Sequence, residues 1–177
     1  MSKRDLKKYL TELNKEQLEE QIIELYEKFA PVKVYYDFVF NPKEDKLLQE
    51  SKVKISHEYF PIKKPNAKWR PKAKMRRSVA QKIIKHFIMI GVDPFVIADI
   101  MLYNIEIAQT YSSNNFIKQE LFYKSILNSF EQAVNFVISN GILYDFKDRI
   151  QAVKQETIQQ KWKNKYDFEA ILEKIDF

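Results

Sequence analysis

The chain has 177 residues, contains no cysteine and only two glycines, and carries a formal net charge of +6. The absence of cysteine excludes disulfides and thiolate chemistry, and the shortage of glycine excludes the glycine-rich loops that bind phosphates and dinucleotides. With 45% hydrophobic and 31% charged residues, the sequence is typical of a soluble globular protein. We also expect a cytoplasmic protein, because it has no cysteine, no signal-peptide pattern at its start and no long uncharged apolar run.

The first two predicted helices begin at clear N-terminal caps. Ser2 and Asn14 are the cap residues, and Asp5 and Gln17 follow three residues later, as in a capping box. Apolar residues then recur at helical spacing. They are Leu6, Tyr9, Leu10 and Leu13 in the first helix, and Leu18, Ile22, Leu25 and Phe29 in the second.

The segment 31–40 allows two interpretations. Its β-branched and aromatic residues suit a strand, but a single strand among helices would have no partner, so we expect a short helix. Asn41 and Pro42 then begin another helix that runs to about Tyr59. One side of that helix is predicted to carry Leu48, Ser51, Ile55 and Tyr59.

A loop at 60–74, which contains three prolines, separates these helices from the rest of the chain. Further helices are expected at about 75–90, 94–111, 116–139, 144–163 and 167–175. Gly91 and Gly141 fall at expected helix ends, where the left-handed conformation is common. The helix at 94–111 is apolar on nearly all sides, which predicts a central position and a buried Asn104.

These patterns predict an all-α fold, a single-domain irregular helical bundle or αα-hairpin array of about seven to nine helices over residues 1–177. The loop at 60–74 would join an N-terminal helical block, 1–59, to a C-terminal block, 75–177.

The positive charge of the chain is concentrated around this loop. Residues 61–92 contain ten basic residues and no acidic one, whereas the remaining 20 basic residues face 24 acidic ones. A local basic patch indicates a polyanionic partner better than a raised isoelectric point does. In this interpretation Lys and Arg side chains contact phosphates, and Trp69 stacks on an unpaired base. The candidate residues are Lys63, Lys64, Lys68, Trp69, Arg70, Lys72, Lys74, Arg76 and Arg77.

A second stretch of similar type, KWKNKY at 161–166, places Trp162 between two lysines. The two stretches would form one groove if the fold brings them together. In the alternative interpretation the loop is a solvated connector whose charge is neutralised by acidic helices. Trp69 would then pack into the core and hold the loop in place.

The apolar helix at 94–111 has a narrow polar stripe that includes Asp99 and Glu106, about 10 Å apart at 1.5 Å per residue. With His86, these carboxylates are candidates for an enzyme or small-ligand site. No Glu-x-x-His pattern of a di-metal site occurs, so we expect no metal, no cofactor and no catalytic residues. Structural ion pairs are the favoured interpretation, because buried acids need partners. The expected partners are Arg76, Arg77 or Lys82.

The segments RRSVAQKIIKHF and GVDPFVIADIMLYNIEIAQTYS, with the opening SKRDLKKYLTELNKEQLEEQIIELYEKF, resemble a family of uncharacterised bacterial proteins, a domain of unknown function (DUF6155). The resemblance covers most of the chain. It implies a small cytoplasmic bacterial protein and assigns no activity, cofactor or site.

Three functions follow from these features. The first is a non-enzymatic cytoplasmic interaction or adaptor protein with an unknown protein partner, which requires an exposed apolar patch of more than a few hundred Å². The second is a module that binds nucleic acid or another polyanion, which requires an exposed loop with Trp69 at the surface. The third is an enzyme or ligand-binding protein, which requires a pocket that holds Asp99 or Glu106 unpaired.

Overall fold

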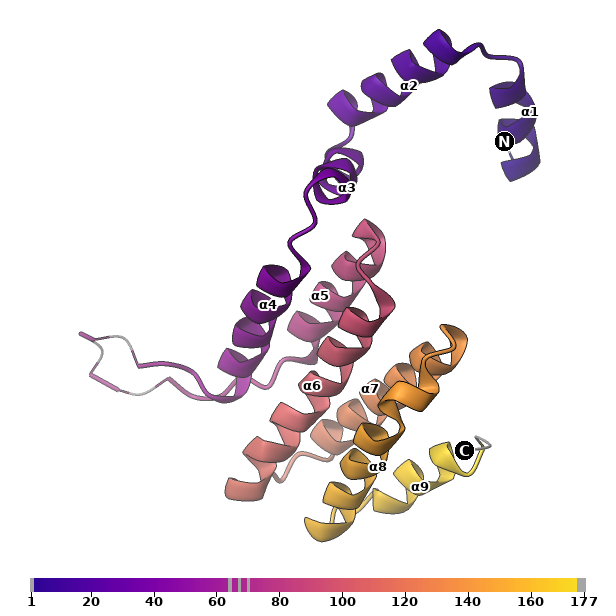
Figure 1. Cartoon of the computed structure of the whole chain (residues 1–177). Helices are drawn as coiled ribbons and strands as arrows, with labels where there is room; N and C mark the ends of the chain where they lie inside the picture. The colour runs from indigo at the N-terminus through magenta and orange to yellow at the C-terminus, as the bar shows by residue number, and fades with distance from the viewer. Residues whose placement is uncertain (1, 64, 67, 70, 175–177) are drawn as a thin grey trace. The chain divides into compact units, whose positions relative to one another are not determined.

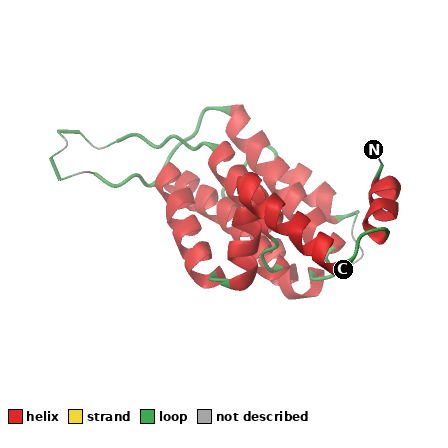
Figure 2. Cartoon of the chain, turned by 90° about the horizontal axis from the view of Figure 1, so that it is seen from above, coloured by secondary structure: helices red, strands yellow, loops and turns green. Residues whose placement is uncertain are grey.

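The computed structural model describes residues 2–174, with the exception of 64, 67 and 70. Two candidate residues of the basic loop, Lys64 and Arg70, therefore lie outside the described residues. The described part forms nine α-helices and no strand, which confirms the all-α prediction (Figures 1 and 2). None of the described helices is long and apolar enough to cross a bilayer.

The helices belong to two compact units that divide between Lys43 and Glu44. The N-terminal unit contains α1 (Lys3–Thr11), α2 (Lys15–Lys28) and α3 (Ala30–Phe40). The C-terminal unit contains α4 (Glu44–Tyr59), α5 (Arg77–Ile90), α6 (Pro94–Asn114), α7 (Glu120–Ser139), α8 (Leu143–Gln159) and α9 (Lys165–Leu172).

This division differs from the block boundary that we expected at the loop 60–74. The loop joins α4 to α5, and both helices pack on α6, so it connects neighbours within one unit. The boundary differs because α4 packs on α6 and so belongs to the C-terminal unit. Its buried residues Ser51, Ile55 and Tyr59 lie on the side of the helix that the sequence predicted.

In the N-terminal unit, both predicted capping boxes are present. The side chains of Ser2 and Asn14 accept hydrogen bonds from the backbone N–H groups of Asp5 and Gln17, whose own side chains accept from the cap N–H groups. The ambiguous segment 31–40 is helical, as we expected. Helix α3 packs on α2, where the Tyr26 hydroxyl donates to an Asp37 carboxylate oxygen at 2.8 Å.

Helix α6 lies at the centre of the C-terminal unit and packs against α4, α5, α7 and α8 (Figure 1). Its residues Ile100, Leu102 and Ile105 are fully buried, and Asn104 is 2% exposed, as the apolar pattern predicts. Aromatic contacts extend the core to the last helix, because the rings of Phe130 and Phe168 lie 5.0 Å apart.

Three helices of this unit end with a residue in the left-handed region. Gly91 and Gly141 have φ of 76° and 71°, as expected for glycine at this position. The third is Lys161, with φ of 54°. The N–H of Lys161 bonds the carbonyl of Ile158, and the N–H of Trp162 bonds that of Thr157, which is the hydrogen-bond pattern of a Schellman motif.

Candidate functional site

The segment 60–74, which we call the basic arm, leaves the end of α4 as a long loop and returns to the start of α5 (Figures 1 and 2). The Trp69 side chain is 78% exposed, which excludes the alternative interpretation in which it packs into the core. The described lysines of the arm are also exposed. They are Lys63, Lys68, Lys72 and Lys74.

The base of the arm is fixed by Glu58, a buried residue of α4. The Arg76 guanidinium donates to both Glu58 carboxylate oxygens, at 2.9 and 2.7 Å, and the Glu58 carbonyl accepts from the N–H groups of Lys74 and Met75. Hydrogen bonds from Arg76 hold the pKa of Glu58 below its ordinary value, although burial opposes them. Arg76 therefore holds the end of the arm against α4, where the arm begins.

Arg77 has a similar structural role at the start of α5. Its guanidinium donates to the Ser129 hydroxyl and to the side-chain oxygen of Gln132, both at 3.0 Å. The arginine thereby ties α5 to α7. Of the described candidate residues, Arg76 and Arg77 are thus occupied by contacts within the unit, whereas Lys63, Lys68, Trp69, Lys72 and Lys74 are exposed along the arm.

An open cleft of about 950 Å³, the arm cleft, lies where the arm meets the ends of α4 and α6. Its aromatic wall is formed by Tyr59, Phe60 and Tyr111, with the Tyr111 ring 5.9 Å from Tyr59 and 5.6 Å from Phe60. Burial raises the pKa of Tyr59 to about 12, so this side chain remains neutral at physiological pH. Lys63 and Lys72 also line this cleft.

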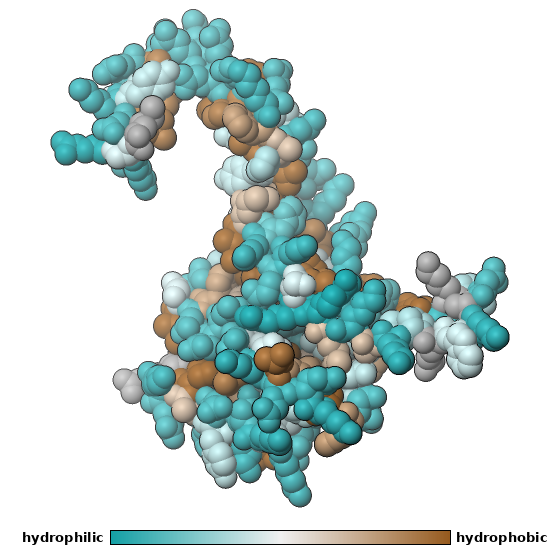
Figure 3. All heavy atoms as spheres, turned by 180° about the vertical axis from the view of Figure 1, so that it is seen from behind, coloured by the Kyte–Doolittle hydropathy of each residue, from teal (hydrophilic) through white to brown (hydrophobic). Residues whose placement is uncertain are grey.

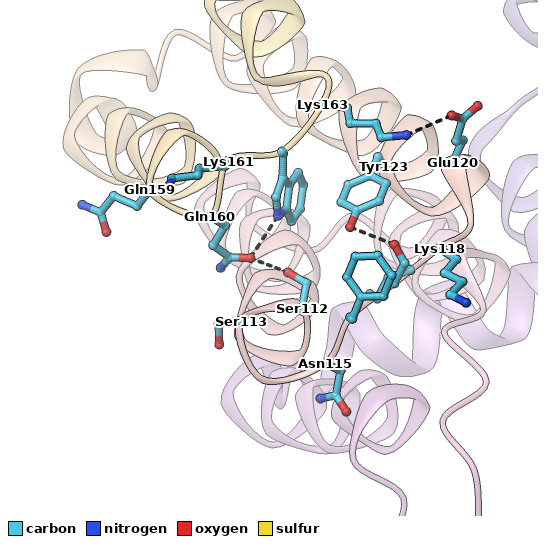
Figure 4. A pocket seen from close by; sticks show the side chains of 13 residues that line it. Ser112, Ser113, Asn115, Lys118, Glu120, Tyr123, Gln159, Gln160, Lys161 and Lys163 are labelled. Carbon is cyan, nitrogen blue, oxygen red and sulfur yellow. Dashed lines mark hydrogen bonds and ion pairs between the residues drawn. The ribbon is translucent and has the colours of Figure 1, made fainter.

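A second cleft of about 680 Å³, the α6-end cleft, lies among the end of α6, the start of α7 and the turn after α8 (Figure 4). Lys118, Lys161 and Lys163 are placed around it. Phe116, also part of its lining, is 87% exposed. Asn115 lines both clefts, so the two adjoin.

The polar contacts of the α6-end cleft come from side chains of three segments. The Gln160 side-chain oxygen accepts from the Ser112 hydroxyl at 2.6 Å and from the Trp162 indole N–H at 2.9 Å. The Tyr123 hydroxyl donates to the carbonyl of Ile117 at 3.1 Å (Figure 4). These bonds fix the wall of the cleft.

The fold therefore brings the two basic-aromatic stretches to adjoining clefts, but it changes the role of the second tryptophan. Trp162 is 4% exposed, with its ring among those of Phe122, Tyr123 and Phe168, so this tryptophan belongs to the core and is not accessible to a base. The exposed ring at this cleft is Phe116, which the sequence did not single out.

The polar stripe of α6 forms an ion-pair cluster. Asp99 contacts Lys52 at 2.6 Å and Arg149 at 2.5 Å, and Arg149 also binds both carboxylate oxygens of Glu106, at 2.5 and 2.8 Å. Ion pairing of these carboxylates was expected, but not with these cations. The predicted partners, Arg76, Arg77 or Lys82, were wrong. Helices α4 and α8, which cover this side of α6, supply the partners instead.

The enzyme hypothesis requires a pocket that holds Asp99 or Glu106 unpaired. This requirement is not met, because both carboxylates are paired in the cluster. Burial would raise the pKa of Asp99, but hydrogen bonds from Lys52 and Arg149 outweigh it and hold the pKa below its ordinary value. His86 is half-buried on α5 and, like the two carboxylates, is not part of the lining of either cleft. No group of three or more histidine, aspartate or glutamate side chains suited to a metal ion occurs among the described residues.

The N-terminal unit presents a second candidate surface. Helices α1, α2 and α3 contain no buried residue. Figure 3 shows hydrophobic atoms, in brown, at the surface of this unit at the top of the view. The large exposed apolar side chains, which we call the N-terminal apolar surface, are Leu6, Tyr9, Leu10, Ile22, Ile23, Leu25, Phe29, Val34, Tyr35, Val39 and Phe40.

Comparisons with known proteins give a family and no further relative. The model of a family of unknown function (DUF6155) matches residues 1–176. No curated protein and no solved structure matches the chain significantly.

Proposed function

The chain belongs to DUF6155, a family of unknown function, and we propose that it works as a non-enzymatic interaction or adaptor protein in the cytoplasm. It docks on a protein partner through the N-terminal apolar surface. One observation carries this proposal: helices α1, α2 and α3 bury none of their side chains, and together with Phe29, which lies between α2 and α3, they expose eleven large apolar ones.

The energetics of a small helical unit support a docking role. A segment of about 40 residues has too little core to be stable alone without added cross-links, metals or association. Each Å² of apolar surface removed from water contributes roughly 25 cal/mol, so covering this unit by a partner would stabilise both the unit and the complex.

The charge of α2 indicates the chemistry of the partner. Five glutamates flank the apolar residues of this helix, against the two lysines Lys15 and Lys28. Each of these lysines already contacts a glutamate of the same helix. A complementary partner therefore offers an apolar groove or helix face bordered by basic residues, because rim charges of opposite sign favour association.

The absence of an accessible acid–base pair on α6 also supports a binding role over catalysis. The carboxylates of Asp99 and Glu106 are both engaged by Arg149, which leaves them to hold α6 against α8.

The proposal can be tested by site-specific photo-crosslinking in cells. A photoreactive residue at Ile23, 57% exposed on α2, should give one dominant crosslinked protein, and that product should disappear when Phe40→Asp is added. The matched control places the same group at Leu121, 79% exposed on α7 of the other unit, and should not give this product.

Hydrogen exchange provides the result that would contradict the proposal. In the purified monomer, amides of α2 and α3 should exchange much faster than those of α6, because few buried contacts protect them. Equal protection of these helices in the monomer would mean that the apolar surface is already covered and needs no partner.

A further inference from the structure

We propose that the C-terminal unit binds a single strand of RNA or DNA along the basic arm and across the two adjoining clefts. Lysine side chains contact the phosphates, and Trp69 and Phe116 stack on unpaired bases. This inference concerns a different unit from the proposed protein docking, so either can fail without the other.

The first argument is the distribution of charge. Lys63 and Lys72 line the arm cleft, and none of the described residues in its lining is acidic. The α6-end cleft adds Lys118, Lys161 and Lys163 against a single acid, Glu120. Glu120 contacts Lys163 at 3.4 Å with both side chains more than four-fifths exposed, so the pair can open to a phosphate at little cost.

The two clefts adjoin at Asn115, which lines both of them, and the proposed path of the strand runs from one to the other. The Asn115 side-chain amide donates to the carbonyl of Tyr111 at 2.8 Å, which satisfies a free carbonyl at the C-terminal end of α6. A strand that follows this path passes lysines from three segments of the chain. They are the arm, the loop before α7 and the turn after α8.

The second argument distinguishes a single strand from other polyanions. Helices α4 and α6 end at the arm cleft, as Tyr59 and Asn115 show, and no helix begins among the described residues of its lining. Helix C-termini carry partial negative charge and disfavour a phosphate on the cleft floor. The favourable arrangement therefore places phosphates at the lysines and the uncharged faces of bases against the aromatic walls. A duplex cannot adopt this arrangement, because its bases are already stacked and paired.

The third argument is the exposure of two aromatic rings. Trp69 is 78% and Phe116 is 87% exposed, whereas Phe130 and Phe168 of the same unit are fully buried. Stacking on a base would cover one face of each ring. The half-buried Tyr123 ring and the buried Trp162 ring, which line the same cleft as Phe116, pack against each other at 5.1 Å and form a fixed part of its wall.

The fourth argument is the backbone of Lys161. This lysine occupies the left-handed position of a Schellman motif, where the other two helix ends of this kind have glycine. A side chain with a β-carbon is disfavoured in this conformation. A lysine therefore lines the cleft at a position where it has a cost in stability, which is common at binding sites.

The test is fluorescence anisotropy with the full chain and a labelled single-stranded RNA of about 12 nucleotides, within the range that such grooves cover. We expect binding that weakens steeply between about 50 and 200 mM salt. Five lysine contacts predict a slope of log K against log salt of about −3.5, since each phosphate contributes about −0.7 on a single strand. Lys63→Gln with Lys72→Gln should reduce the steepness by about 1.4, whereas the control pair Lys54→Gln with Lys85→Gln should leave it unchanged.

Aromatic variants separate base stacking from charge alone. Trp69→Ala and Phe116→Ala should each weaken binding roughly 5- to 100-fold, and Trp69→Phe should restore most of the loss. Tyr144→Ala is the matched control, because Tyr144 is 89% exposed at the opposite end of α8 and should have no effect.

Two further measurements can contradict the proposal. One is competition with the labelled strand by other polyanions, and the other is binding by the Lys161→Gly variant. Duplex DNA, inorganic polyphosphate and vesicles with anionic lipid should compete at least tenfold less well than the single strand. Equal competition by any of them, or unchanged binding in both aromatic variants, would show a nonspecific or different polyanion surface. Lys161→Gly should weaken binding without lowering the thermal midpoint, and unimpaired binding would remove this lysine from the site.

Discussion

Helices α1 and α2 of the N-terminal unit begin at capping boxes, yet α1, α2 and α3 bury no side chain, whereas α6 alone buries nine residues. Caps and helical periodicity are present in both units, so these local signals determine where helices form in each. They do not determine stability, which comes mostly from packing of the apolar faces. The comparison indicates a stable C-terminal unit and an N-terminal unit that depends on what covers it.

The largest expected difference between the units comes from removing one phenylalanine ring in each. Phe130→Ala on α7, fully buried against Phe168, should lower the free energy of unfolding by about 3–5 kcal/mol. Phe40→Ala on α3, where the ring is 80% exposed, should change it by less than about 0.5 kcal/mol in the isolated protein. Urea unfolding of both variants measures this difference, and similar losses would show that Phe40 is covered in solution.

Breaking an ion pair should also lower stability more in the C-terminal unit than in the N-terminal unit, but the difference should be smaller. Arg149→Met leaves Asp99 and Glu106 half-buried without their shared partner, so we expect a loss of about 1–3 kcal/mol. Lys15→Ala breaks an exposed pair with Glu19 on α2 and should cost no more than about 0.5 kcal/mol. Thermal unfolding of the two variants checks the order, and a neutral Arg149→Met would show that the cluster contributes no net stability.

Acid should destabilise the C-terminal unit through the same carboxylates. The folded-state pKa values of Asp99 and Glu58 lie below their ordinary values of 3.8 and 4.5. Their stabilising contribution is therefore complete above those ordinary values and is lost as pH falls through the lower folded-state values. Urea unfolding followed by circular dichroism from neutral pH to about pH 3 measures this loss, which should be smaller in Arg149→Met. An equal loss in that variant would assign the acid sensitivity to other groups.

The smallest expected effects concern two helix ends with the same backbone conformation. Gly141→Ala places a β-carbon in open space at φ of +71°, so its cost of about 1 kcal/mol is purely conformational. Lys161→Gly should have the opposite sign and a similar or smaller size, because it removes the β-carbon from that conformation. Differential scanning calorimetry of both variants resolves the two signs, and a destabilised Lys161→Gly would mean that the lysine side chain contributes packing.

Much of the fold could be predicted because its signals are local. The caps at Ser2 and Asn14, the glycines at 91 and 141 and the apolar pattern of α6 each depend on residues within a few positions. The helix end at Lys161 could not be predicted in this way, since the residue there is not glycine.

Tertiary partners were the part that local patterns could not supply. Arg149 lies 50 residues after Asp99, and nothing in the spacing distinguishes it from nearer cations such as Lys82. Trp69 and Trp162 have similar basic neighbours but opposite exposure, because Trp162 directly follows the left-handed end of α8 and turns into the core. Basic flanks therefore indicate a charged segment without showing whether its tryptophan is accessible.

The closure of the basic arm at Glu58 has a consequence for how such a chain can change over time. Because Arg76 and two backbone N–H groups fix the arm at its base, the packing of α4 and α5 on α6 does not depend on the number of residues between them. Doubling the length of a flexible loop costs only about 0.6 kcal/mol. Insertions and deletions in the arm are therefore nearly neutral for folding, so related chains can vary its reach while they keep the same helical body.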